Sequence, residues 1–282
     1  MKNKKIFITG SSGQSGREIA KLLAKEYEIV GFDKIQGAST TIVADLTDWE
    51  TIKNATKGVS AIIHTASLHA PHVATHSRED FINTNIKGTL YLLEASKING
   101  VKKFVYTSTT SLYGESMNIE KEAAWITEEV VPKPRDIYDI TKITAEELCK
   151  DFFDKETFQA ISLRVSRFWE EPPENKVFYR MYRGLDIRDV ARAHELALKA
   201  EMDNFEVFNV SAQSIFNQDD LFDLKNNLHA LLNSRIPKLV DFFDKNGWEL
   251  PTSIDRVYVI EKAKKVLNYQ PVFNIDEMLS EF

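Results

Sequence analysis

The chain has 282 residues, of which 43% are hydrophobic, so it can bury a full core. Its 42 acidic and 36 basic residues give a net charge of -6 without any basic block, which excludes an obvious nucleic-acid or anionic-membrane surface. No segment reaches the roughly 20 apolar residues of a membrane span, the N-terminus lacks a signal-peptide core, and the single cysteine, Cys149, suits a reducing compartment. We therefore expect a cytoplasmic protein that binds neither nucleic acid nor membrane.

The first two-thirds of the chain alternate short apolar runs with longer segments of helical period. The runs are apolar throughout, as strands buried on both faces are, and alternating units of this kind predict a parallel sheet covered by helices, an α/β doubly wound fold. We expect strands at 5–9, 28–32, 41–44, 61–65, 103–107 and 160–165, with helices at about 15–26, 48–55, 78–99 and 137–153.

After about residue 166 the pattern loosens. A helix at 186–200 and a strand at 206–211 still fit the sheet, so we assign residues 1–165 and 186–212 to one domain. The remaining segments, 166–185 and 213–282, are expected to form a small C-terminal lobe that binds substrate, with Trp169 and Trp248 in its core. Its amphipathic helices are predicted at 218–233, 235–245, 258–267 and 274–281.

Three glycines, Gly10, Gly13 and Gly16, lie directly between the first strand and the first helix. Glycines in this position allow a tight turn and let the backbone approach a pyrophosphate at the helix N-terminus, so they favour a Rossmann-type dinucleotide site over a plain turn. Asp33 ends the second strand, where a carboxylate can bind both ribose hydroxyls and repel a 2′-phosphate. The sequence therefore favours NAD over NADP as the cofactor. The alternative to a ribose contact is that Asp33 only stabilises the turn at the end of the strand.

An ordered set of motifs resembles the extended short-chain dehydrogenase/reductase superfamily, in particular its NAD-dependent epimerase/dehydratase family, over essentially the whole chain. "TGSSGQSG" resembles the family's TGxxGxxG opening, and "YDITK" (138–142) resembles its YxxxK motif. Other matching segments are Asp45-Leu46, "HTAS" (64–67), "NTNIKGT" with Asn85, "YTSTTSLYG" (106–114), "SLR" and "DIRDVARAHELAL".

The resemblance implies that Tyr138 is the general acid/base of a hydride transfer. Lys142 would lower the pKa of the phenol and grip the nicotinamide ribose, while Thr109 would hold the reacting oxygen, with Ser108 as the reserve candidate. Considered without the family, a Tyr and a Lys four residues apart are a common helix pattern, and Ser/Thr hydroxyls after a strand more often satisfy backbone groups.

The expected site residues follow from the same motifs. For NAD they are Gly10, Ser12, Gly13, Gln14, Gly16, Asp33, Asp45, Leu46, Thr65, Ala66, Ser67, Asn85, Thr107, Tyr138 and Lys142. For substrate they are His69, Thr109, Arg164, Ser166 and Arg188. No metal is expected, because the histidines of "LHAPHVATH" lack a cysteine or acid that would complete a usual ligand set.

The function expected from these residues is NAD-dependent oxidation, reduction or epimerisation at a carbinol or keto carbon of a sugar or sugar nucleotide. Only 24 residues (165–188) separate Arg164 from Asp189, where nucleotide-sugar enzymes of the family usually have a longer insertion. A smaller secondary alcohol or a uronic acid is therefore an alternative substrate. A non-catalytic NAD-binding regulator is the alternative from another class, and the family implies a homodimer through helices 78–99 and 137–153.

Overall fold

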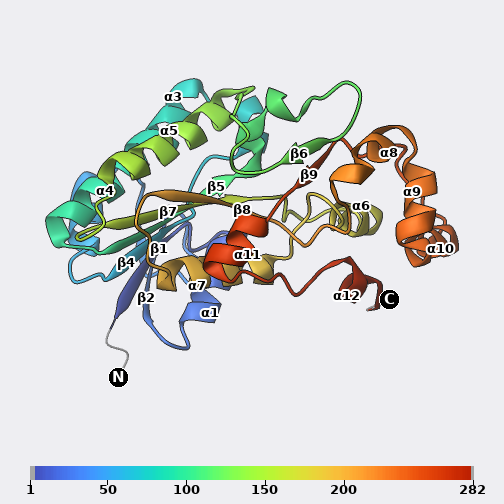
Figure 1. Cartoon of the computed structure of the whole chain (residues 1–282). Coiled ribbons are helices and arrows are strands. Elements are labelled where there is room, and N and C mark those ends of the chain that lie inside the picture. Colours follow the sequence, from blue (N-terminus) through green and yellow to red (C-terminus); the bar gives the residue numbers. More distant parts are fainter. Residues whose placement is uncertain (1–3, 281–282) are drawn as a thin grey trace.

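The computed structural model describes residues 4–280 and has a seven-stranded sheet beside a smaller helical lobe (Figure 1). Every neighbouring pair of strands in the sheet is parallel. In spatial order the strands are β3 (Ile42–Val43), β2 (Glu28–Asp33), β1 (Lys5–Thr9), β4 (Ala61–His64), β5 (Lys103–Thr109), β7 (Gln159–Val165) and β8 (Glu206–Val210). This confirms the predicted Rossmann-type doubly wound fold, in which ligands bind outside the carboxyl ends of the strands near the switch between β1 and β4.

Helices cover both faces of the sheet, as the runs of buried apolar residues in its strands require. One face packs against α1 (Gln14–Leu23), α7 (Ile187–Lys199) and α11 (Glu261–Leu267). The other packs against α2 (Trp49–Ala55), α4 (Gly88–Asn99) and α5 (Ile137–Phe152). Figure 1 shows α4 and α5 together on one side of the sheet and α1 and α7 on the opposite side.

The lobe has a separate hydrophobic cluster, in which Phe178, Leu232, Phe243 and Val257 are buried. Its helices are α6 (Pro173–Tyr179), α8 (Leu221–Asn226), α9 (Leu228–Arg235), α10 (Pro237–Asn246) and α12 (Ile275–Ser280). A two-stranded parallel sheet, β6 (Ala124–Ile126) with β9 (Arg256–Tyr258), joins the lobe to an excursion of the sheet domain. Trp248 packs edge-on against Phe243, as expected of a lobe-core residue.

Several predicted element boundaries are wrong. The helix predicted at 78–99 consists of α3 (Arg78–Phe81), a π-helical segment (Ile82–Lys87) and α4. The helix predicted at 218–233 is a 3-10 turn (Gln218–Asp220) followed by α8 and α9, and the one predicted at 258–267 begins only at Glu261 because Tyr258 pairs in β9.

The helix α6 and both strands of the small sheet, β6 and β9, were not predicted. α6 begins at Pro173, the second of the paired prolines, in the first helical turn, where a missing backbone N–H costs nothing. β6 has three residues, too few for a period, and is defined by its pairing with β9. The last predicted helix extends to residue 281, which lies outside the described residues. Within 4–280, no helix is both long and apolar enough to cross a membrane.

Candidate active site

A cavity of about 290 Å³ lies at the carboxyl ends of β1, β2 and β4. Gly10, which has φ +70°, lines it and leads into the N-terminus of α1. Gly16 does not line the cavity, but a Cβ there would lie 2.1 Å from the carbonyl oxygen of Gly10. Only glycine therefore lets α1 approach the loop this closely. The predicted NAD residues on this cavity are Gly10, Gly13, Gln14, Asp33, Asp45, Leu46, Thr65, Ala66 and Ser67.

Asp33 is held at the edge of this cavity by the glycine loop. Its Oδ2 accepts a hydrogen bond from the Ser12 backbone N–H (2.9 Å) and its Oδ1 accepts one from Ile35 N–H (3.1 Å). The Ser12 hydroxyl donates to the Ile35 carbonyl oxygen (2.5 Å) and does not line the cavity. Ser12 therefore positions Asp33, and the carboxylate keeps free lone pairs for a ribose.

A buried histidine connects the loops around this cavity. The Thr89 hydroxyl donates to the Asn85 carbonyl oxygen (2.6 Å), so it accepts from the Nε2–H of His64 (3.0 Å). The Nδ1 of His64 then accepts from the Thr9 hydroxyl (2.7 Å), which itself accepts from Ala66 N–H (3.2 Å). Burial lowers the pKa of His64 to about 3, so the ring is neutral and this chain of hydrogen bonds has one direction at neutral pH.

Asn85 lies behind the cavity instead of lining it. Its side-chain oxygen accepts from Leu68 N–H (2.7 Å), and its amide donates to the Leu68 carbonyl oxygen (3.0 Å) and to the Thr141 hydroxyl (2.9 Å). The predicted NAD contact is therefore replaced by a structural one. Asn85 ties the loop after β4 to α5, the helix that carries Tyr138 and Lys142.

A second cavity, of about 500 Å³, adjoins the first. Both are lined by Ser15, Thr65, His69, Phe168 and Trp169. The second cavity also carries the predicted catalytic residues and the remaining polar residues of the strand ends: Tyr138, Lys142, Thr107, Ser108, Thr109 and Ser166. Residues from α5, β5 and the segment after β7 therefore meet in one space next to the cofactor cavity.

Tyr138 lies in the first turn of α5, whose N-cap Asp136 accepts a hydrogen bond from Asp139 N–H (3.0 Å). Burial raises the pKa of Tyr138, the hydrogen bond with the Thr109 hydroxyl lowers it in part, and the carboxylates of Asp139 and Asp136 raise it further. This is contrary to the lowering that we expected from Lys142. At neutral pH the phenol is protonated, ready to donate to an oxygen in the cavity.

Lys142 is only 2% exposed, and its ammonium group has few partners. Nζ donates to the Thr107 carbonyl oxygen (2.6 Å) and lies 4.2 Å from the centre of the Tyr106 ring. Burial lowers the pKa of Lys142 to about 7, although Glu146 and Cys149 act to raise it. Lys142 therefore titrates near neutral pH, within the cavity that also holds Tyr138.

We expect the stability difference between the wild-type protein and Lys142→Met to depend on pH. Because the folded-state pKa of about 7 is below the ordinary 10.5, the unfolded chain binds more protons between these values. The wild-type protein should therefore gain stability relative to the variant as pH rises from 7 to 10. Urea unfolding at several pH values measures this, with Lys150→Met as the control for an exposed lysine of the same helix. A difference that stays constant with pH would contradict the buried titration.

Two predicted substrate residues, Arg164 and Arg188, are not on this cavity. Arg164 is buried and points into the interior, where its Nη2 lies 2.8 Å from Glu146 Oε2 and its Nη1 donates to the Tyr113 hydroxyl (3.0 Å). Arg188 pairs with Asp186 (2.8 Å) and lies over the Phe273 ring, beside a separate cavity of the lobe. The substrate contacts predicted for both are wrong, since packing directs each guanidinium to another partner.

His69 lines the second cavity as predicted, and its ring lies 6.1 Å from that of Tyr138. Burial lowers the pKa of His69 to about 3, and Lys142 lowers it further. Trp169 packs edge-on against His69 at 5.5 Å and lines both cavities with 42% of its surface exposed. Its predicted place in the lobe core is therefore wrong. Its position directly after the carboxyl end of β7 was the signal that would have placed it at the site.

Comparison with known proteins places these features in a family. Residues 6–170 match the NAD dependent epimerase/dehydratase family model. The chain is 22% identical to a 3-beta-hydroxysteroid dehydrogenase of Mycolicibacterium neoaurum, over 98% of this chain and 90% of that one. It is 23% identical to a uronate dehydrogenase of Pseudomonas syringae pv. tomato, over 69% of each chain. The fold matches a short-chain dehydrogenase/reductase superfamily protein of Agrobacterium tumefaciens solved with bound NAD, with a TM-score of 0.73, 22% identity and coverage of 98% and 95% of the two chains.

The family match covers the strand–loop–helix glycines, the acid that ends β2, and the helix that carries Tyr138 and Lys142. The glycine cradle at Gly10 and Gly16 and the Asp33 carboxylate fit the pyrophosphate and ribose of a dinucleotide. The protein is therefore an enzyme whose cofactor is NAD, and it belongs to the NAD dependent epimerase/dehydratase family.

Proposed function

We propose that this enzyme transfers a hydride at a carbinol or keto carbon of a sugar-like substrate, with Tyr138 as its acid/base. One observation carries the proposal: Tyr138, Lys142 and Thr109 line a single cavity that shares Thr65 and His69 with the cofactor cavity. Bound NAD takes a hydride from a carbinol carbon or returns it to a keto carbon. The reacting carbon would lie where the two cavities meet.

The chain supplies the proton chemistry of this reaction. Tyr138 donates its phenolic proton to the substrate oxygen in reduction and takes it back in oxidation. The Thr109 hydroxyl bonds the phenol and helps to orient it, while the Thr109 Oγ1 also accepts from Ser111 N–H (3.1 Å). Lys142, protonated, stabilises the phenolate that oxidation requires. Ser108 lines the same cavity with a hydroxyl that has no hydrogen-bond partner among the described residues, so it stays in reserve as a substrate contact.

The substrate we favour is smaller than a nucleotide sugar. Between the end of β7 at Val165 and the start of α7 at Ile187, the lobe contributes only one short helix, α6. Such a short connection leaves little chain to enclose a nucleotide diphosphate. The uronate dehydrogenase among the relatives supports a free sugar or uronic acid, whereas the full-length match to a steroid dehydrogenase keeps a larger secondary alcohol as the second candidate.

A cofactor assay distinguishes the remaining activities. Purified protein is denatured and tested for released NAD, because an epimerase keeps its cofactor and a dehydrogenase exchanges it. The protein is then given NAD with free sugars, uronates, nucleotide sugars and secondary alcohols, and NADH formation is followed by absorbance. A dehydrogenase should reduce added NAD with one of these classes. NAD binding without turnover on any of them would favour a non-catalytic regulator instead.

We also propose that the protein is a cytoplasmic homodimer in which residues 78–99 and α5 form the interface. Apolar side chains are exposed on these elements at Ile82, Ile98 and Ile140, and burying them in a dimer would remove that surface from water. The proposed division into an NAD-binding domain and a substrate lobe is supported by their separate hydrophobic clusters. Its bounds shift in two places: α11, which we assigned to the lobe, packs in the cluster of the sheet domain, and Ala123, which we assigned to the NAD-binding domain, packs in the cluster of the lobe. Sedimentation should give a dimer, and a monomer at micromolar concentration would contradict the interface.

A further inference from the structure

The second cavity carries a strong excess of positive charge. Arg135, Arg167, Arg183 and Arg256 line it together with Lys142, and Glu170 is the one carboxylate among its lining residues in the described part of the chain. The neighbouring His69 is neutral, because burial lowers its pKa to about 3. A cavity with low-dielectric walls and one sign of charge concentrates ions of the opposite sign. Its charge therefore favours an anionic occupant.

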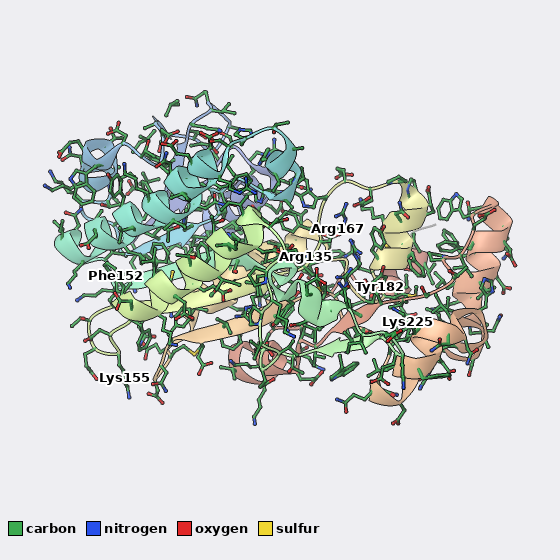
Figure 2. All side chains as sticks on the ribbon, turned by 90° about the horizontal axis from the view of Figure 1, so that it is seen from above. Arg135, Phe152, Lys155, Arg167, Tyr182 and Lys225 are labelled. Carbon is green, nitrogen blue, oxygen red and sulfur yellow. The ribbon has the colours of Figure 1, made fainter. Side chains whose placement is uncertain are left out.

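Three of these arginines are brought together by one backbone turn at 182–184. On one side, Arg167 N–H donates to the Arg183 carbonyl oxygen (3.0 Å). On the other side, Tyr258 N–H donates to the Tyr182 carbonyl oxygen (3.3 Å), which places β9 and its Arg256 next to the turn. Figure 2 shows Arg135 and Arg167 in the region between the sheet domain and the lobe, with Tyr182 toward the lobe. Together with Arg135, the arginines that line the second cavity thus come from four separate segments of the chain.

The partners of these guanidinium groups differ. Arg167 pairs with Glu171, and Arg135 lies 3.5 Å from Asp139. Arg183 has no ion pair with any carboxylate among residues 4–280; its guanidinium lies over the faces of the Tyr179 and Tyr182 rings, at 4.6 and 5.9 Å. Aromatic faces hold a guanidinium in place without neutralising its charge. Arg183 is therefore a positioned cation without an anionic partner in the described part of the chain.

Arg256 is the second incompletely paired cation. Its side chain is 12% exposed, its Nη2 lies 2.8 Å from Asp255, and its Nη1 donates only to the sulfur of Met117 (2.9 Å). Its buried Nε has no hydrogen-bond partner among the described residues. A buried charged donor without a partner is costly, and an oxygen from a ligand would satisfy it.

We propose that the substrate carries a carboxylate or phosphate group, which Arg183 and Arg256 bind on the lobe side of the cavity. This anionic group is distinct from the carbon that reacts at Tyr138, and it anchors the rest of the molecule so that this carbon reaches the cofactor. The inference rests on the proposed hydride transfer and specifies its substrate class. A uronic acid and a sugar phosphate are two sources of the same anionic chemistry.

The test measures binding separately from turnover. Protein saturated with NADH, which cannot accept a hydride from these probes, is titrated by calorimetry with D-glucuronate, D-galacturonate and D-glucose 6-phosphate, and with neutral D-glucose and D-galactose. At least one anion should bind about tenfold or more tightly than its neutral counterpart, and Arg183→Gln should remove about tenfold of that affinity. Arg183→Lys should restore part of it. Arg192→Gln, which changes an exposed arginine paired with Glu195 outside the cavity, is the matched control and should bind like the wild-type protein. Tighter binding of the two uronates than of D-glucose 6-phosphate would identify a carboxylate as the anionic group, and the reverse order would identify a phosphate.

The inference is overturned if the wild-type protein shows no preference for any anion over the neutral sugars, or if Arg183→Gln leaves the preference unchanged. These failures are separate from failure of the proposed reaction. If the protein oxidises a neutral sugar, Tyr138→Phe abolishes this turnover and no anion is preferred, the proposed hydride transfer is supported and the anionic substrate is rejected. Anion binding that Arg183→Gln removes, without NAD reduction by any probe, supports the anion site while the proposed reaction fails.

Discussion

Replacement of Tyr138 by phenylalanine is expected to lower turnover by about 10²- to 10⁴-fold while NAD binding is almost unchanged. The phenolic oxygen is the only atom lost, and it is the group that exchanges a proton with the substrate oxygen. The ring stays in place, because Tyr138 is only 6% exposed and packs with Phe81 and Leu68 in a small hydrophobic cluster. Steady-state kinetics on a substrate found in the screen, together with calorimetry of NAD binding, measure the two quantities.

The control for this change is Tyr27→Phe, which removes a hydroxyl from a partly buried tyrosine that lies outside both cavities. It should leave turnover within about twofold of the wild-type value, since it touches no reacting group. Full turnover by Tyr138→Phe would show that another group handles the proton. In that case Ser108 and Thr109, whose hydroxyls line the same cavity, become the candidates to replace next.

The largest expected effect on stability comes from Glu146→Gln, at a site that never contacts substrate. Arg164 donates to both carboxylate oxygens of Glu146, from Nε (3.1 and 3.3 Å) and from Nη2 (2.8 Å). Burial by itself lowers the pKa of Arg164, but its hydrogen bonds with Glu146 outweigh this and raise it. The variant leaves Arg164 buried and unpaired, so the free energy of unfolding should fall by roughly 3–5 kcal/mol. Urea unfolding measures it.

Glu147→Gln provides the matched control, because Glu147 follows on the same helix and forms only an exposed pair with Lys150 at 3.7 Å. Its effect should stay below about 1 kcal/mol. A double variant in which both Glu146 and Arg164 are replaced by methionine should recover much of the lost stability, since Arg164 is then no longer a buried charge without its partner. Equal losses for Glu146→Gln and Glu147→Gln would mean that the buried pair does not hold α5 to β7.

The same pair links stability to the site. Glu146 lies one turn after Lys142 on α5, and its charge raises the pKa of Lys142 against the effect of burial. On the other side of Arg164, the Tyr113 hydroxyl donates to Asn209 Oδ1 (2.7 Å) in β8. This network therefore fixes the helix that carries Tyr138 and Lys142 against two strands of the sheet. Arg164 therefore stabilises the position of α5 from the protein interior, although we predicted that it would contact substrate.

The sequence by itself determined the parallel α/β order, the glycine loop between β1 and α1, the acid that ends β2 and the Tyr138–Lys142 pair on one helix. These features are local: periodicity, turn residues and fixed spacings encode them within about 20 residues. The family match confirms the cofactor and the enzyme class that they implied.

Only the tertiary structure decided where the arginines point. Arg164 faces Glu146 because α5 packs across β7, whereas Arg183 and Arg256 reach the cavity because the turn at 182–184 pairs with β9. Asn85 likewise faces Leu68 instead of the cofactor. Arg164 and Asn85 are directed by partners 18 and 17 residues away, and the turn at 182–184 is joined to β9 by a hydrogen bond between Tyr182 and Tyr258. No local pattern records such contacts. The positive cavity beside Tyr138, and with it the anionic substrate we propose, emerges only when these distant segments pack together.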